Sequence, residues 1–286
     1  MNASIGIVIL CLTFILLMIY AFFIEPFLIQ VRKIDIRIPK LPPQMDGFTI
    51  CHLSDIHSTG YGILEKLIKR KLGSISADIC VITGDLVQRL DASDCFKRVF
   101  ESFNPAYGIY AIPGNGEHKW KVDIKALAGK LLDAEIRLMV NSNLLFDVNG
   151  CRMCIIGVDD PFMAYDDVKL AYNGCSDSDF ELLLAHSPDV LANIGEYRPG
   201  LILSGHTHGG QVRLPFIGAL WLHCRYPYGI SDGFYGSDEI SARTGKSMDG
   251  IGMYVSRGLG ASIIHARFLC RPEITVLTLR CNDESL

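Results

Sequence analysis

The chain has 286 residues, 49% of them hydrophobic, with a mean hydropathy of +0.27 and a formal net charge of −4. This length accommodates one large domain or two small ones. The slightly acidic balance does not provide the basic surface that nucleic-acid binding requires, so we expect no nucleic-acid partner. Ten scattered cysteines in a chain this long do not indicate a disulfide-stapled small domain, and we expect all ten to be free thiols in a reducing compartment.

The N-terminal segment is predicted to cross a membrane. Residues 5–24 (IGIVILCLTFILLMIYAFFI) are apolar and uncharged, and about 20 such residues span a bilayer as a helix. A cleaved signal peptide would need a basic residue before this run and small residues after it. No Lys or Arg precedes the run, and bulky Phe22, Phe23 and Phe27 lie where small residues would be needed. We therefore predict an uncleaved transmembrane anchor over residues 1–24.

The residues after this anchor are basic. Arg32, Lys33, Arg37 and Lys40 follow the apolar run, whereas no basic residue precedes it. The positive-inside rule then predicts a single-pass protein of the cell inner membrane with its main body in the cytoplasm. Residues 25–40 form this juxtamembrane segment, in which 31–39 alternates apolar and charged residues as an edge strand does.

From residue 41 to 286 we predict one catalytic domain. Short apolar strands at 48–53, 79–83 and 108–112 are followed by helical segments near 63–74, 93–103 and 122–134. This alternation predicts an α/β sandwich. Later strands are expected at 145–158, 181–185, 201–203, 253–256 and 274–279.

The first of these later segments is expected to be a hairpin that turns at Asn149-Gly150. It places Cys151 and Cys154 on opposite faces of one strand, so they do not form a zinc or redox pair.

Residues 214–250 do not fit this pattern. They are rich in Gly, Tyr and Phe, contain Trp221 and show no periodicity. The stretch is too long for an ordinary connection, so it is either a functional loop or locally disordered, and its aromatic residues favour a functional loop.

Five strand ends are followed at once by possible metal ligands. They are Leu53-Ser-Asp55-Ile-His57, Thr83-Gly-Asp85, Pro113-Gly-Asn115, Ala185-His186 and Ser204-Gly-His206-Thr-His208. Ligands of open α/β sheets bind outside the carboxyl ends of the strands. Pairs of side chains two residues apart point the same way in extended chain. Imidazole, carboxylate and carboxamide without thiolate suit Mn, Fe or Zn. The isolated His52, His223 and His265 are interpreted as structural.

The ordered set D-x-H, GD, GN, H and GHTH resembles the calcineurin-like metallophosphoesterase superfamily, over about residues 34–279. Longer strings at 54–57, 205–211, 254–260 and 270–273 resemble a membrane-associated bacterial branch. That branch includes forms of UDP-2,3-diacylglucosamine pyrophosphatase, an enzyme of lipid A synthesis. The resemblance implies a four-layer α/β/β/α sandwich, here preceded by one N-terminal transmembrane helix.

The resemblance also implies a pair of divalent metal ions, with manganese favoured and iron or zinc as alternatives. Asp55, His57, Asp85 and His208 would bind one ion, and Asp85 would bridge to a second ion held by Asn115, His186 and His206. Two cations would hold the phosphate and activate water for direct attack at phosphorus.

One position departs from the family pattern. The family usually places a histidine directly after the asparagine, where it protonates the leaving group, but this chain has Gly116 there. We predict that His118 takes this catalytic role or contacts the phosphate. Alternatively, the leaving group needs little help, as in cleavage of a nucleotide pyrophosphate.

The predicted function is hydrolysis of a phosphoanhydride or phosphodiester, with UDP-2,3-diacylglucosamine as the leading substrate. The expected partners are a lipid-linked or nucleotide phosphate substrate and the membrane, without an obligate protein partner. The alternatives are a broad-specificity phosphodiesterase or phosphatase, and a metal-binding scaffold without catalysis.

Overall fold

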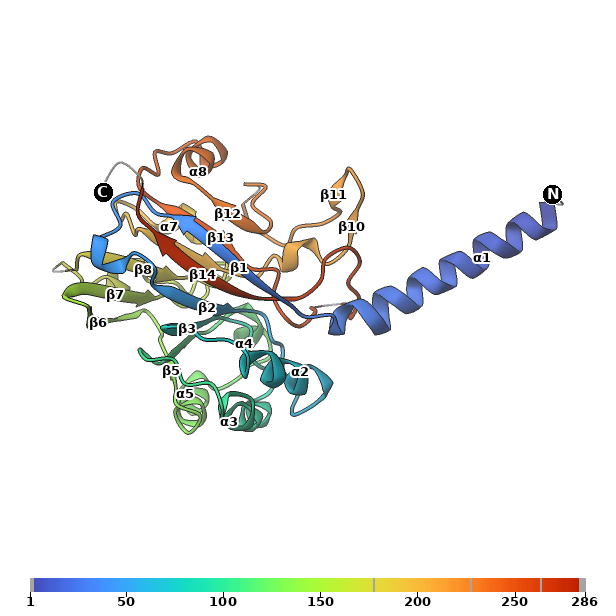
Figure 1. The fold of residues 1–286 in the computed structure, drawn as a ribbon, viewed down its shortest axis with the longest axis horizontal. Coiled ribbons are helices and arrows are strands. Elements are labelled where there is room, and N and C mark those ends of the chain that lie inside the picture. The colour runs from blue at the N-terminus through green and yellow to red at the C-terminus, as the bar shows by residue number, and fades with distance from the viewer. Residues whose placement is uncertain (1–2, 177, 227, 263, 283–286) are drawn as a thin grey trace.

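The computed structural model describes residues 3–176, 178–226, 228–262 and 264–282. Two six-stranded sheets pack face to face (Figure 1). The first sheet has the order β1 (Gln30–Arg37), β14 (Glu273–Arg280), β2 (Thr49–Leu53), β3 (Ile79–Thr83), β4 (Ile109–Ile112) and β5 (Ile136–Leu138). The second has the order β12 (Gly233–Tyr235), β13 (Gly252–Val255), β9 (Leu201–Ser204), β8 (Phe180–Leu184), β7 (Cys151–Gly157) and β6 (Ser142–Val148). Each sheet mixes parallel and antiparallel pairs.

Helices cover the outer face of each sheet. The first sheet carries α2 (Ile63–Leu72), α3 (Phe96–Phe100) and α5 (Ile124–Leu132), and the second carries α6 (Val168–Ala171), α7 (Val190–Asn193) and α8 (Ser237–Thr244). Short 3-10 helices occupy Pro43–Met45 and Leu90–Cys95. The strands alternate accordingly: in β3, Val81 faces the core between the sheets and Ile82 the core under the helices. The predicted four-layer α/β/β/α sandwich is confirmed.

The N-terminal helix extends away from this sandwich (Figure 1). Helix α1 (Ala3–Ile19) continues through a π-helical segment, Tyr20–Ile24, into a 3-10 turn, Glu25–Phe27. Within the described part of the chain, Ser4–Phe27 is the one helix long and apolar enough to cross a membrane, and only 6% of its apolar window is buried. Its length and composition suit a membrane anchor or a signal sequence. Strand β1 follows and lies at the edge of the first sheet, as predicted.

The aperiodic segment 214–250 contains regular elements. Strands β10 (Arg213–Leu214) and β11 (Gly218–Ala219) form a small hairpin outside both sheets, followed by β12 and α8. These elements are two to eight residues long. Periodicity cannot identify strands this short, and α8 is a mostly polar helix that buries only Ile240.

The expectation of ten free thiols is wrong for one pair. Cys154 in β7 forms a disulfide with Cys175, whose Cα lies 6.3 Å away. The loop after α6 folds back over the outer face of the second sheet, so both cysteines are buried in the same outer core. Cys151 instead faces the core between the sheets, which confirms the predicted opposite orientation of Cys151 and Cys154. The remaining described cysteines are free.

Candidate metal centre

The strand ends bring the seven predicted ligands to one edge of the sandwich. Strands β2, β3 and β4 are parallel neighbours in the first sheet, and β8 and β9 are parallel neighbours in the second. Their carboxyl ends are followed by Asp55, His57, Asp85, Asn115, His186, His206 and His208. All of these are buried except His57 and Asn115, which are partly exposed. Asn115 begins helix α4 (Asn115–Lys119).

One group of possible ligands comprises Asp55, His57 and His208, whose ligand atoms all lie within 4.8 Å of one another. The Nε2 atoms of His57 and His208 are 3.3 Å apart, and their rings are stacked. His208 Nε2 lies 3.4 Å from Asp55 Oδ1.

A second group comprises Asp55, Asp85 and His186. His186 Nε2 lies 3.3 Å from Asp85 Oδ1 and 3.0 Å from Asn115 Oδ1. His206 Nδ1 approaches His186 Nε2 to 3.1 Å. Asn115 and His206 therefore lie against this second group.

Asp85 faces both groups. Its Oδ1 approaches His186, whereas its Oδ2 lies 3.4 Å from His57 Nε2. Two atoms that bind one metal ion at about 2.1 Å, with an angle of about 90–109° between them, lie roughly 3.0–3.4 Å apart. The observed separations have this size. The two groups are thus adjacent, and a carboxylate stands between them as it does between paired metal ions.

The histidines can offer one ring nitrogen each to these groups. His186 Nδ1 lies 2.8 Å from the Thr83 carbonyl oxygen and must donate to it, so Nε2 is the atom that can bind a metal ion. Burial lowers the pKa of His186, but the charge of Asp85 and its hydrogen bond outweigh burial and raise this pKa well above the usual range, so metal binding at Nε2 would release a proton. Burial, reinforced by the charge of neighbouring histidines, holds the pKa of His206 and of His208 well below the usual range. Neutral imidazole is the form that binds metals.

Two buried ring nitrogens, His206 Nε2 and His208 Nδ1, have no hydrogen-bond partner among the described residues. The other nitrogens of these two rings are the ones that face the groups: His206 Nδ1 lies 3.1 Å from His186 Nε2, and His208 Nε2 lies 3.3 Å from His57 Nε2. Facing ring nitrogens are unfavourable unless a cation or proton lies between them. The residues therefore fit a dinuclear metal site.

The carboxylates respond to this environment. Burial opposes the ionisation of Asp85, but the charges of His186 and His57 outweigh it and hold its pKa below the usual range. Burial, together with the charge of Asp85, raises the pKa of Asp55. Asp85 is therefore ionised. A carboxylate that bridges two metal ions must be ionised, because both of its oxygens then act as acceptors.

Glu117 supports the site from behind and was not predicted. Its carboxylate accepts hydrogen bonds from the backbone N–H groups of Asp85 (3.2 Å), Val87 (2.9 Å) and Gly114 (2.8 Å). It thereby joins the loops after β3 and β4. Burial and the charge of Asp85 raise the pKa of Glu117 to about 7. The residue stands at the third position of α4, and the pattern Gly-x-x-Glu of a capping box could have identified it.

The ligand loops have an unusual backbone. Asp55, His57, Asp85, His206 and His208 all have φ between 50 and 69°. Such conformations cost about 1–3 kcal/mol each and persist where surrounding contacts enforce them. Backbone hydrogen bonds supply those contacts: Asp55 N–H donates to the Gly84 carbonyl at 3.1 Å, and His57 N–H to the Asp85 carbonyl at 2.8 Å.

Gly116, where the family pattern has histidine, has a steric reason to be glycine. Its N–H donates to Asp85 Oδ1 at 2.6 Å. A Cβ at this position would lie 2.7 Å from the same oxygen and 3.0 Å from Asp85 Cγ. Any side chain at this position would therefore displace the carboxylate that faces both groups.

His118 belongs to neither group of possible ligands. Its Nε2 lies 2.7 Å from Asp159 Oδ1, and its ring stacks on Tyr165 at a centroid distance of 4.0 Å. Burial lowers the pKa of His118, but the hydrogen bond to Asp159 outweighs this effect and raises it above the usual value. The catalytic role of His118 therefore stays a prediction.

A small pocket of about 60 Å³ opens over the ligand groups. Besides ligands, the described residues around it are Gln88, Gly116, Lys119, Trp120, His223 and Ser262. His223, interpreted from the sequence as structural, lies with its ring centroid 5.0 Å from that of His206 and 4.7 Å from that of Phe162. Because His223 belongs to the aperiodic segment, no sequence pattern indicated its position. His52, in contrast, lies in the core and is hydrogen-bonded to Thr83.

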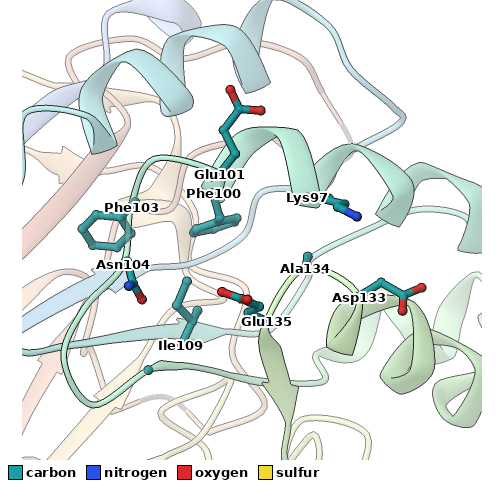
Figure 2. Close-up of a pocket in the computed structure, with 10 residues that line it drawn as sticks. Lys97, Phe100, Glu101, Phe103, Asn104, Ile109, Asp133, Ala134 and Glu135 are labelled. Carbon is teal, nitrogen blue, oxygen red and sulfur yellow. The ribbon is translucent and has the colours of Figure 1, made fainter.

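A second hollow, of about 440 Å³, lies beside α3 and the end of α5 (Figure 2). Lys97, Glu101, Asp133 and Glu135 line it together with Phe100. None of the described residues that line it is a histidine or cysteine, in contrast to the ligand groups at the strand ends.

Comparison with known proteins agrees with this geometry. Residues 48–210 match the family model of calcineurin-like phosphoesterases. The chain is 32% identical over 273 residues to YkuE of Bacillus subtilis, an uncharacterized metallophosphoesterase, covering 92% of this chain and 90% of that protein. It is 26% identical over 315 residues to LpxG of Chlamydia muridarum, a UDP-2,3-diacylglucosamine pyrophosphatase, covering 93% of each.

A bovine transmembrane protein with a metallophosphoesterase domain is 29% identical over 270 residues, which are 87% of this chain and 57% of that protein. The family match contains all seven predicted ligands. The chain is a metal-dependent phosphoesterase and belongs to the calcineurin-like metallophosphoesterase family.

Proposed function

We propose that this enzyme hydrolyses a phosphoanhydride or phosphodiester of a lipid-linked substrate. UDP-2,3-diacylglucosamine is the leading candidate, and its products would be UMP and the acylated sugar phosphate. The observation that carries the proposal is the pair of adjacent Asp/His groups beneath a pocket, in a chain that begins with an apolar helix. The similarity to LpxG supports this lipid.

The proposed ligand assignment divides these residues as the family resemblance implies, with Asp85, which faces both groups, as the shared ligand. Asp55, His57, Asp85 and His208 would hold one ion, and Asp85, Asn115, His186 and His206 the other. Bound divalent ions would polarise the phosphoryl group and lower the pKa of water. We name manganese first, with iron and zinc as alternatives, because the ligands are imidazole, carboxylate and carboxamide.

The chain itself contributes orientation and charge. Glu117 holds together the loops that carry Asp85 and Asn115 by accepting hydrogen bonds from both. Lys119 lies at the mouth of the pocket, where its ammonium group can neutralise phosphate charge. Direct attack of water at phosphorus would be in line with the leaving oxygen.

Protonation of the leaving group is assigned to His118 as a proposal. Its raised pKa favours a proton donor, whereas its Nε2 is hydrogen-bonded to Asp159 and it is not among the residues that line the pocket. A nucleotide phosphate leaves readily without a donor. The test is the activity of His118→Ala on substrates with good and with poor leaving groups. If His118 donates the proton, the variant loses activity only on the substrate with the poor leaving group.

We place the catalytic domain in the cytoplasm, because Arg32, Lys33, Arg37 and Lys40 follow the apolar helix. The disulfide between Cys154 and Cys175 argues for the other side of the membrane, where disulfides persist. Fusion of alkaline phosphatase or a fluorescent protein to the C-terminus decides the orientation. A fluorescent, phosphatase-inactive fusion supports the cytoplasm, and the reverse pattern overturns it.

A broad-specificity phosphodiesterase or phosphatase is the second candidate. The pocket over the ligand groups is only about 60 Å³, which suits a phosphoryl group and leaves the rest of the substrate outside. A metal-binding scaffold without catalysis is disfavoured, because all seven ligands are present and brought together.

The test is metal-dependent turnover of the full chain in detergent. The protein is stripped with chelator, reloaded with Mn²⁺, and assayed for UMP release from UDP-2,3-diacylglucosamine and for cleavage of an aryl phosphodiester, with Asp85→Ala as control. Restored UMP release that the variant lacks supports the lipid substrate. Cleavage of the aryl diester alone would leave the second candidate.

A further inference from the structure

The β10–β11 hairpin and the residues after it expose an unusual number of large apolar side chains. Phe216 is fully exposed, and Ile217 and Trp221 are 70% and 74% exposed. Single exposed apolar side chains are common, but a contiguous group marks a contact surface. We define the hairpin patch as Leu214, Phe216, Ile217, Leu220, Trp221 and Leu269, all of them exposed.

The patch is joined to the apolar N-terminal helix. Arg267 N–H donates to the Ala21 carbonyl at 2.9 Å, and the buried Glu25 carboxylate accepts from the N–H groups of Leu269 and Cys270 at 2.9 and 2.6 Å. Tyr20 in the helix and Phe268 in the loop form an edge-to-face ring pair. The end of the helix is therefore fixed to the loop that carries Leu269.

The same loop is bridged to the hairpin. Val212 and Phe268 form a parallel β-bridge, in which Arg213 N–H donates to the Phe268 carbonyl and Phe268 N–H to the Gln211 carbonyl, both at 2.9 Å. Helix, loop and hairpin thus form one hydrogen-bonded unit. The hairpin leaves the body beside the base of α1 (Figure 1).

The hairpin also borders the metal centre. It begins five residues after His208, and Gly209 and Gly210 intervene. Ser262, which lines the pocket, exchanges two hydrogen bonds with Gln211, at 3.1 and 3.0 Å. Cys270 donates through its thiol to the His208 carbonyl at 3.3 Å.

From this continuity we propose that the hairpin patch enters the surface of the bilayer that the N-terminal helix crosses, and that it sets the pocket at headgroup depth. Tryptophan and phenylalanine are suited to this interface. The substrate is then a phospholipid-like molecule whose acyl chains stay in the bilayer while its phosphate reaches the ligand groups. This substrate class rests on the proposed function, whereas the membrane contact of the patch does not.

The two tryptophans of the chain allow a direct test. Trp120→Phe leaves Trp221 as the single reporter in full-length protein, inserted as one copy in phosphatidylcholine nanodiscs. Replacing part of the lipid with a 5-doxyl phosphatidylcholine should quench its emission to half or less. Phe216→Asp with Ile217→Asp in this background should abolish the quenching. The matched control is Leu132→Asp, an exposed leucine on α5, which should leave it unchanged.

Trp221 that is unquenched by the labelled lipid and open to aqueous iodide would overturn the proposal. That result would indicate that the patch binds a protein partner or a second copy of the chain. A single-copy nanodisc contains neither of these. The quenching needs no turnover, so it stays interpretable if the proposed function fails.

Activity tests the substrate class separately. Phe216→Asp with Ile217→Asp should lower turnover of a nanodisc-embedded lipid substrate at least fivefold and leave cleavage of a soluble aryl phosphodiester within twofold. An equal loss on both substrates would overturn the assignment of the substrate class.

Discussion

The ligand loops and the hairpin patch depart from ordinary protein architecture in opposite directions. At the metal centre, Asp55, Asp85, His206 and His208 are buried on a strained backbone. In the hairpin patch, Phe216 lies in the turn between β10 and β11 and Trp221 follows β11, and both side chains are exposed. Buried charge and exposed apolar surface both reduce stability. Each therefore points to a component from outside the chain, metal ions in one region and, we propose, lipid in the other.

The largest effect is expected from Asp85→Asn. The amide keeps the shape but cannot serve as an anionic ligand to both groups, so we expect loss of bound metal and a decrease in kcat of about 10³-fold. Metal content by mass spectrometry and turnover of an aryl phosphodiester measure it. The control is Asp94→Asn, whose side chain is 64% exposed and paired with Lys130. Full metal occupancy in Asp85→Asn would contradict the bridging position.

Gly116→Ala should have the next largest effect. The added Cβ would lie 2.7 Å from Asp85 Oδ1, so the carboxylate must shift. We expect metal affinity to fall by about 10- to 100-fold, the size seen when a neighbour of a metal ligand is disturbed. Titration with Mn²⁺ followed by calorimetry measures it.

Gly129→Ala is the matched control for that change. A Cβ at Gly129 in α5 meets nothing within 4 Å, so this variant should be more stable by about 0.5–1 kcal/mol, with unchanged metal affinity. If Gly116→His bound metal normally and cleaved poor leaving groups faster, the steric account of Gly116 would be wrong.

The contrast between these regions also explains what the sequence could predict. Asp55, Asp85 and His186 each follow a short, apolar, buried strand, so the sandwich and the gathering of its strand ends were predictable. His223 and the hairpin belong to a segment whose elements are too short for a period. The disulfide between Cys154 and Cys175 depends on how one loop folds back, which spacing alone does not determine.

His118→Ala should have a moderate effect that depends on pH. The pKa of His118 is raised in the folded protein, so its pairing with Asp159 stabilises fully below the unfolded pKa of about 6.5. That stabilisation is lost as pH rises through the folded pKa. We expect the free energy of unfolding to fall by about 1 kcal/mol at pH 6, after allowance for partial solvent screening, and by less at pH 9.

Urea unfolding at the two pH values measures this difference. His265→Ala, which removes an exposed histidine, is the control and should leave the pH dependence unchanged. An effect of His118→Ala that is equal at both pH values would show that packing on Tyr165, rather than the charge pair, is what is lost.

The smallest effect on catalysis is expected from Glu25→Gln, which tests whether the two regions are mechanically independent. The glutamine can accept only one of the two backbone hydrogen bonds from Leu269 and Cys270, so we expect a loss of about 1 kcal/mol in stability. Lipid quenching of Trp221 should weaken because the hairpin is less firmly held beside the helix. Cleavage of a soluble diester should stay within twofold of wild type, as in the control Glu135→Gln at an exposed site. A tenfold loss on the soluble substrate would instead show that the helix contact reaches the metal centre through Cys270 and His208.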